Sequence, residues 1–211
     1  MFEIEYKGAN SVIISTKKAK IVIDPKLSIV GLKDLVTKDA VEMVTEDRFA
    51  LNSSDGILTI NGPGEYGVAD LDIRGVPARC YTDGEDKDMF STMYRIEIGD
   101  TRVGVIGNIC EKLSDEQLED LGVIDVLIIP VGGGGYTLDA NGSAALVRMI
   151  NPKVVVPTHY NDKQLKYEVP QDELSLFVAE LGAPVEVVPK YKYKQPLVGS
   201  QPLSVVEITR S

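Results

Sequence analysis

Histidine is almost absent from this chain of 211 residues, which carries only His159. A catalytic zinc usually has three protein ligands, and a two-metal hydrolytic centre has more, most of them imidazoles. A histidine-rich metal centre therefore cannot form within this chain. His159 itself stands at the end of an apolar run, residues 154–158, of the kind that forms a buried strand. Metalloenzymes often place a ligand at such a strand end.

Cysteine, positive charge and long apolar runs are scarce as well. Cys80 and Cys110 are too few for a disulfide scaffold and too far apart for a CxxC motif. No apolar run approaches the roughly 20 residues of a membrane helix, and the first residues lack the features of a signal peptide. The net charge of -10 disfavours nucleic acids and anionic membranes as partners. We therefore expect a cytoplasmic protein with no nucleic-acid or membrane partner, whose assembly into a homo-oligomer the sequence leaves open.

Short strand patterns fill the first half of the chain. Runs rich in Ile and Val are separated by turn residues, and Gly99-Asp100 between two of these runs predicts a hairpin. A Gly-rich stretch at 62–66 is typical of a turn. The predicted strands are residues 2–6, 11–15, 19–23, 40–44, 57–60, 71–76, 92–98 and 102–106.

Helices and strands alternate in the second half. Residues 114–117, Ser-Asp-Glu-Gln, fit a capping box for a short helix that Gly122 closes. Asp139 is expected to open a second helix, and a third is expected to begin near Pro170 and to end at Gly182. The strands predicted here are 123–130, 154–159, 185–188 and 204–208. This order predicts two packed sheets with helices outside, built as a single domain over residues 1–211.

Lysine and tyrosine alternate over residues 190–194. In a strand the lysines would share one face and the tyrosines the other. Lysines on an exposed edge strand discourage pairing with other chains, so we favour protection of a sheet edge over nucleic-acid binding.

Several predicted strands end in small or polar residues, at 45–48, 107–108, 132–135 and 158–159. Open sheets bind ligands outside their strand ends, so we expect these ends to converge on one pocket. Five motifs along the chain also follow one another in a characteristic order. They are Gly8-Ala9-Asn10-Ser11-Val12, Ile21-Val22-Ile23-Asp24-Pro25, Gly62-Pro63-Gly64-Glu65-Tyr66, Pro130-Val131-Gly132-Gly133-Gly134-Gly135-Tyr136-Thr137 and Pro157-Thr158-His159-Tyr160.

Together these motifs resemble the metallo-β-lactamase superfamily, in the branch that includes sugar-phosphate lactonases and many unassigned hydrolases. The resemblance covers almost the whole chain. It implies an α/β (α+β) fold, a four-layer αββα sandwich with the metal pocket at one edge of the two sheets.

Departures from that family lie where its metals bind. After the strand at 40–44 the family carries three histidines and an aspartate, and residues 45–51 of this chain match none of them. A later family histidine falls at Thr82, and the bridging aspartate falls at Asn108, which is neutral. Among the metal ligands only His159 matches, so we expect no metal cofactor. The candidate pocket comprises Glu46, Arg48, Thr82, Asn108, Gly133, Gly134 and His159.

The favoured hypothesis is a metallo-β-lactamase-fold protein with a degenerate metal site, acting as a non-catalytic binding or scaffold module. One alternative is a metal-dependent hydrolase of the same superfamily that holds zinc or another divalent metal at a reduced site around His159. Another is a small-anion or sugar-phosphate binding protein, because backbone amides of a glycine loop at 132–135 attract anions. For these glycines, however, a tight turn that allows close packing is favoured.

Overall fold

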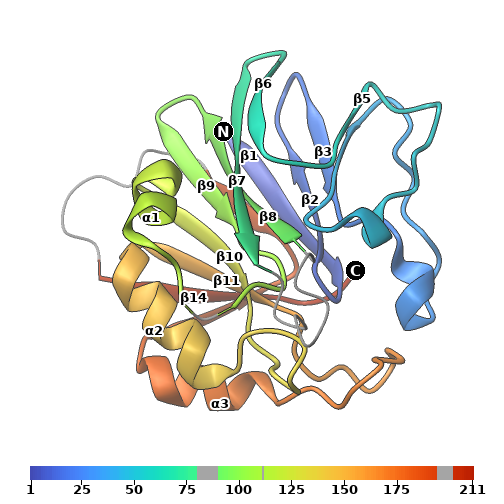
Figure 1. Cartoon of the computed structure of the whole chain (residues 1–211). Helices are drawn as coiled ribbons and strands as arrows, with labels where there is room; N and C mark the ends of the chain where they lie inside the picture. Colours follow the sequence, from blue (N-terminus) through green and yellow to red (C-terminus); the bar gives the residue numbers. More distant parts are fainter. Residues whose placement is uncertain (80–89, 111, 194–201) are drawn as a thin grey trace.

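The structure of the chain is a computed structural model that describes residues 1–79, 90–110, 112–193 and 202–211 (Figure 1). Two β-sheets lie face to face, and the α-helices pack outside one of them. The first sheet contains, in spatial order, β13 (Tyr191–Tyr193), β1 (Phe2–Gly8), β2 (Ser11–Ser15), β3 (Lys20–Ile23), β4 (Val41–Met43) and β5 (Leu58–Ile60). The second contains β12 (Val185–Val188), β14 (Ser204–Ile208), β11 (Val154–Thr158), β10 (Val126–Pro130), β9 (Thr101–Val105), β8 (Phe90–Ile98), β7 (Leu71–Arg79) and β6 (Gly64–Val68).

The main core lies between the two sheets, and alternation along the strands builds it. In β1 the side chains of Phe2, Ile4 and Tyr6 are buried in this core, while the residues between them are partly exposed. In β10 all five residues are buried, because strands cover both its edges and helices cover its outer face. The alternating run of β1 therefore corresponds to burial of one face, and the continuous apolar run of β10 corresponds to burial of both faces, as the sequence predicts.

Three α-helices cover the outer face of the eight-stranded sheet: α1 (Asp115–Leu121), α2 (Ala140–Ile150) and α3 (Leu174–Leu181). The predicted capping box of Ser114 and Gln117 is confirmed, and the Asp139 side chain caps α2 by accepting from the Gly142 amide. The prediction that the third helix begins near Pro170 is wrong by four residues. The Asp172 amide donates to the carbonyl of Gly132, which holds this segment in a loop until Leu174.

The outer face of the six-stranded sheet is covered differently. Irregular chain and two short 3₁₀ turns, η1 (Leu27–Val30) and η2 (Asp47–Phe49), lie over it, and Leu35 packs on Ile13 and Val22. Within the described ranges this face carries no α-helix. The predicted α/β fold with two packed sheets is confirmed. Of the four αββα layers expected, the one outside the six-stranded sheet consists of loops and 3₁₀ turns in the described residues.

The stretch 62–66 shows where sequence reasoning failed. It was expected to form a turn, but residues Gly64–Val68 form the edge strand β6, which pairs antiparallel with β7. Glycine lowers strand propensity, and most of β6 is exposed, so no apolar alternation revealed it. In the part of the chain that the structure describes, no helix is long and apolar enough to cross a membrane.

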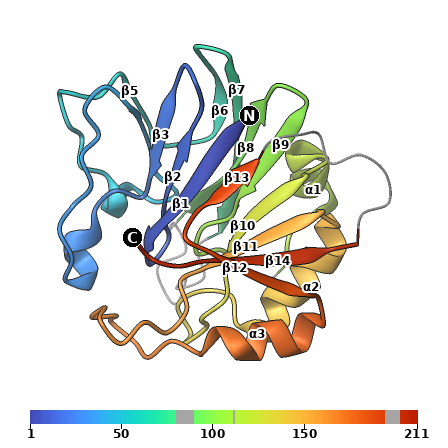
Figure 2. The ribbon, with the colours of Figure 1, turned by 180° about the vertical axis from the view of Figure 1, so that it is seen from behind.

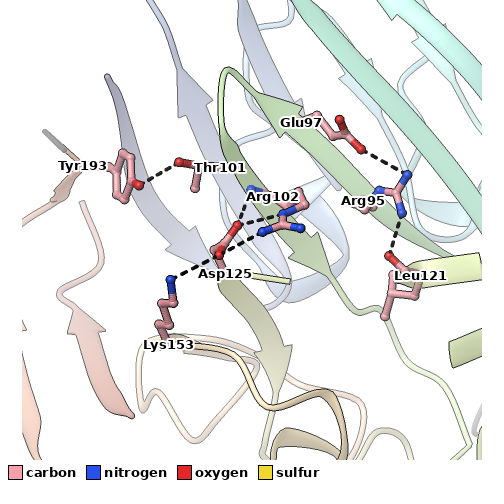
Figure 3. A network of polar contacts seen from close by, with 8 residues as sticks. All are labelled: Arg95, Glu97, Thr101, Arg102, Leu121, Asp125, Lys153 and Tyr193. Carbon is pink, nitrogen blue, oxygen red and sulfur yellow. Dashed lines mark hydrogen bonds and ion pairs between the residues drawn. The ribbon is translucent and has the colours of Figure 1, made fainter. Parts of the chain in front are cut away.

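Polar contacts fix the end of the second sheet where β10 begins (Figure 3). The Asp125 carboxylate accepts hydrogen bonds from the backbone amide and the guanidinium of Arg102, each at 3.0 Å, and Lys153 lies 3.8 Å away. The backbone carbonyl of Asp125 also accepts from the amides of Lys153 and Val154. One buried carboxylate thus aligns β10 with both of its neighbours.

The strand β13 closes the first sheet against β1, and Figure 2 shows the two side by side. The rings of Tyr193 and Phe2 stack with centroids 4.7 Å apart, and the Tyr193 hydroxyl accepts from Thr101 in the other sheet. On the opposite face Lys190 and Lys192 form ion pairs with Glu3. Lys192 therefore lies on an edge strand and Lys190 directly before it, as predicted, while Lys194 lies outside the described residues.

Candidate functional site

One edge of the sandwich gathers the ends of five strands. Asp24 follows β3, Glu46 follows β4, Asn108 follows β9, the glycine loop follows β10, and His159 follows β11. Hydrogen bonds and ring contacts connect these ends, as described below. Their convergence follows from the topology, because β9, β10 and β11 run parallel and end at the same edge.

A chain of polar side chains crosses this edge. The Asn10 Nδ2 donates to Asn108 Oδ1 at 3.0 Å, and the Asn108 Nδ2 donates to Glu46 Oε1 at 2.8 Å. Glu46 Oε2 lies 2.7 Å from Arg48 Nε, and the Glu46 side chain is only 5% exposed. The Asn108 side chain is thereby held between a carboxylate on one side and an amide on the other.

The guanidinium of Arg48 lies against two aromatic rings. Its Cζ is 4.6 Å from the ring centroid of Phe49 and 4.6 Å from that of Tyr136. Tyr136 in turn stacks on the His159 ring at 5.9 Å, and Tyr167 lies on that imidazole at 5.0 Å in a tilted arrangement. A cation, three aromatic rings and the lone imidazole thus form one continuous contact.

His159 is buried, with 4% of its surface exposed, and its Nδ1 lies 3.0 Å from Gln171 Oε1. Burial lowers the pKa of this imidazole to about 4, although the bond to Gln171 opposes the shift. His159 is therefore neutral near pH 7. Its backbone φ is 51°, a left-handed conformation, and its amide donates to the carbonyl of Ala9. A neutral imidazole held in this way can accept a hydrogen bond, or serve as a base or ligand.

Asp24 is a second buried titratable group, 2% exposed, at the same edge. Its two oxygens accept from the backbone amide and the hydroxyl of Thr45, each at 2.8 Å. Burial raises the pKa of the Asp24 carboxyl to about 7, because the bonds from Thr45 offset only part of the desolvation. Around neutral pH this carboxyl exists in both protonation states.

The glycine loop packs tightly against the segment before α3. A Cβ on Gly132 would lie 2.1 Å from the carbonyl of His159, and one on Gly134 would lie 2.5 Å from the carbonyl of Pro170. Gly133 has a φ of 65°. The amides of Gly133, Tyr136 and Thr137 donate to carbonyls within the turn itself. Close packing accounts for these glycines, and those amides are already used.

Of the predicted pocket residues, the structure connects Glu46, Arg48, Asn108 and His159, the last through Tyr136. Gly133 and Gly134 lie in the packed turn behind them, and Thr82 lies outside the described residues. Sequence reasoning missed four participants, Asn10, Asp24, Tyr136 and Gln171. Asn10, Asp24 and Tyr136 belong to the motifs that carry the family resemblance, which was the available signal; Gln171 belongs to none.

The residues that the structure describes do not fit a two-metal hydrolytic centre. Among the described residues no group of three or more His, Cys, Asp or Glu side chains could hold a metal ion. In the loop after β4, the nearest carboxylate, Glu46, is bound to a guanidinium and to Asn108. Because the Arg48 guanidinium already neutralises Glu46, this carboxylate has no uncompensated charge to offer a metal ion.

Comparison with known proteins places the chain in a family. Residues 3–159 match the profile of the Beta-lactamase superfamily domain, so the chain belongs to the metallo-β-lactamase superfamily. A metal-dependent hydrolase from Thermococcus onnurineus is 30% identical over 126 residues, which cover 57% of this chain and 55% of that protein. The match thus spans little more than half of that relative.

Solved structures show the same fold. A Thermotoga maritima protein named as a candidate Zn-dependent hydrolase of the metallo-β-lactamase superfamily has a TM-score of 0.79 at 23% identity, with 99% of both chains covered. Igni18, a metallo hydrolase from Ignicoccus hospitalis, has a TM-score of 0.67 at 19% identity, covering 99% of this chain and 95% of that chain. These structures therefore share the fold of this chain.

Proposed function

We propose that this protein keeps the metallo-β-lactamase fold but has a degenerate metal site, and that it acts as a non-catalytic binding or scaffold module. The same proposal includes a single domain over residues 1–211, a cytoplasmic location and no resident metal cofactor. The chain of Asn10, Asn108, Glu46 and Arg48 is the observation that carries it.

Charge balance supports this proposal. In the family, metal cations offset the carboxylates of the site. Here the Arg48 guanidinium lies beside the carboxylate of Glu46, and the family's bridging aspartate is the neutral Asn108. A covalently attached cation and a neutral amide together meet the electrostatic need that metal ions meet in a hydrolase. Hydrolysis also needs an activated water, and the described residues offer no set of ligands to activate one.

A metal-dependent hydrolase with a reduced site around His159 is the alternative function. The relative from Thermococcus onnurineus is named as a metal-dependent hydrolase, and His159 is a neutral imidazole at a strand end. A small-anion or sugar-phosphate binding protein has less support, because three amides of the glycine loop donate within their own turn.

Elemental analysis of the purified protein tests the proposal. We expect far less than one equivalent of zinc, iron or manganese per chain after dialysis. Added zinc should leave the melting temperature unchanged, since a ligand of the folded state would raise it. We also expect no hydrolysis of lactones, phosphodiesters or thioesters.

The variant His159→Ala provides the discriminating control. About one metal per chain in the wild type, together with a zinc-dependent rise in melting temperature that disappears in His159→Ala, would establish the reduced-site hydrolase instead. A rise in melting temperature with phosphate or sugar phosphates, independent of metal, would support the anion-binding function.

A further inference from the structure

A small cavity is lined by His159 and by residues that follow several of the converging strands. The cavity has a volume of about 30 Å³, enough to hold a water-sized polar group, within a hollow of about 470 Å³ that includes open solvent. Its polar lining includes Asn10, Asp24 and His159, and its apolar lining includes Leu27 and Val30. We propose that this cavity binds the ammonium group of a primary alkylamine, with the alkyl chain along the apolar wall.

Hydrogen-bond directions leave Asn10 with an unused acceptor. Glu46 is ion-paired with Arg48, so its carboxylate accepts and the Asn108 group facing it is the donating Nδ2. Asn108 Oδ1 is then an acceptor, and Asn10 presents its own Nδ2 to it. Asn10 Oδ1 remains, buried and without a hydrogen-bond partner among the described residues. Asn10 is only 6% exposed and lines the cavity, so this oxygen has to be satisfied from there.

A second, independent series of hydrogen bonds leaves an unused acceptor on His159. Gln171 Nε2 donates to the carbonyl of Val169, so Gln171 Oε1 is the atom that faces the imidazole, and it can only accept. His159 Nδ1 therefore carries the proton in the neutral ring, and Nε2 carries a lone pair. The tautomer is thus fixed by the bond at the opposite nitrogen. Two side chains of the cavity consequently each offer an unused acceptor, Asn10 Oδ1 and His159 Nε2.

Charge in the cavity favours a cation. Asp24 and Glu168 line it with carboxylates, and Lys26 is the one cationic residue of the lining. The nearby guanidinium of Arg48 is already paired with Glu46. Asp24 has already received two hydrogen bonds from Thr45, and a carboxylate has room for more. A primary ammonium group carries three N–H donors. That number matches the acceptors of Asn10, Asp24 and His159.

Aromatic side chains complete the lining. Phe49, Tyr136 and Tyr167 all line the cavity, and ring faces attract cations. The protein itself provides a precedent, because the Arg48 guanidinium lies 4.6 Å from two of these three rings. Such a ligand fits only if the metal centre is lost, as proposed above, since a metal at His159 would occupy the same lone pair.

Thermal unfolding with butylammonium chloride tests this site, at about one pH unit above the pKa of Asp24 so that the carboxylate is charged. Sodium chloride at equal ionic strength and butanol, which has the same alkyl chain without the charge, are the matched controls. We expect a rise of about 3 to 5 °C in melting temperature at tenfold excess over the Kd, growing with the logarithm of the concentration beyond that. Butanol and sodium chloride should not produce this rise.

Variants then locate the site. Asp24→Asn should abolish the rise, while Asp72→Asn, an exposed aspartate of β7, should keep it. If Asp24→Asn does not fold, Phe49→Leu provides a second reading and should weaken the Kd by about 3- to 10-fold through loss of one ring. Equal shifts with butanol, no shift with butylammonium, or an unchanged Kd in the folded variants would overturn the proposal.

Metal analysis of the same samples separates the two possible failures. No metal and no response to butylammonium would overturn the amine site alone and leave the proposed function standing. A stoichiometric metal at His159 would overturn the proposed function, and with it the amine site.

Discussion

Two buried carboxylates, each paired with an arginine, lie at opposite ends of the strands. At the start of β10, Asp125 accepts from the backbone amide of Arg102 as well as from its side chain, so it aligns neighbouring strands (Figure 3). At the strand ends, Glu46 contacts only the side chains of Arg48 and Asn108 in the hydrogen bonds and ion pairs described. The first carboxylate helps to build the sheet. The second belongs to a group of side chains that contact one another at the strand ends.

Removal of the Asp125 carboxylate, at the start of β10, should have the largest effect on the free energy of unfolding. Asp125→Ala leaves the Arg102 amide and guanidinium without their acceptor at a mostly buried point, so we expect a loss of about 3 kcal/mol in the free energy of unfolding. Urea denaturation measures it. Asp120→Ala, which removes an exposed partner of Arg74, is the control and should cost less than about 1 kcal/mol. Equal losses in the two variants would contradict the structural role of Asp125.

The strand-end pair should respond differently to a double change. Arg48→Met leaves Glu46 buried without its counter-charge, which should cost about 2 kcal/mol in the free energy of unfolding. The double variant Glu46→Gln/Arg48→Met should recover at least half of that loss, because no buried charge remains. The matched pair Asp125→Asn/Arg102→Met should show no such recovery, since the amide of Arg102 still lacks its anionic acceptor. If both double variants recovered stability, the proposed difference between the Glu46 and Asp125 carboxylates would be wrong.

Asp24 and His159, two titrating groups at the strand ends, should have opposite effects on how stability depends on pH. Asp24 has a folded-state pKa of about 7, above its ordinary 3.8, so its contribution to stability is present at low pH and is lost as pH rises. His159 has a folded-state pKa of about 4, below its ordinary 6.5, so its contribution is lost as pH falls. Between pH 4 and 6.5 the folded state holds one proton on Asp24 and the unfolded state holds one on His159. Their opposing slopes therefore cancel.

Single substitutions should reveal these slopes. In His159→Asn, which tolerates the left-handed backbone, the stability should fall as pH rises from 4 to 6.5, by about 1 kcal/mol per pH unit. In Asp24→Asn it should fall by a similar amount as pH is lowered over the same range. Chemical denaturation at a series of pH values measures both. Parallel pH profiles in the two variants would show that these groups do not hold the shifted pKa values.

The smallest effect on stability should come from the lysine edge. Lys192→Val on β13 should leave the melting temperature unchanged, because its ion pair with Glu3 is exposed. It should, however, increase self-association in analytical ultracentrifugation, since a charge that protects an edge strand is gone. Lys163→Val, in an exposed loop, is the control. Unchanged association of Lys192→Val would show that β13 needs no such protection.

Local patterns predicted most of the fold. The alternation in β1, the continuous apolar run of β10 and the caps of α1 and α2 each depend on residues close in sequence. The exposed, Gly-containing strand β6 carries no such pattern and was missed. The late start of α3 depends on a bond between Asp172 and Gly132, which no local pattern contains.

The candidate site was predictable only in part. The topology and the motifs brought Glu46, Arg48, Asn108 and His159 into consideration, because strand ends meet at one edge. Their actual contacts were not predictable, since the position of Arg48 against Tyr136 and of Gln171 against His159 depends on how separate loops pack. The hydrogen-bond directions that point to a cavity with acceptors also appear only once those contacts are known.

The pairing of β1 with β13 has a consequence for how the chain is made. Phe2 lies opposite Tyr193, so β1 is synthesised long before β13, the strand that becomes its second neighbour. Contacts so distant along the chain slow folding, because a long loop has to close before they form. The six-stranded sheet can therefore be completed only after residue 193 has been synthesised, and until then a chaperone has an open β1 edge to recognise.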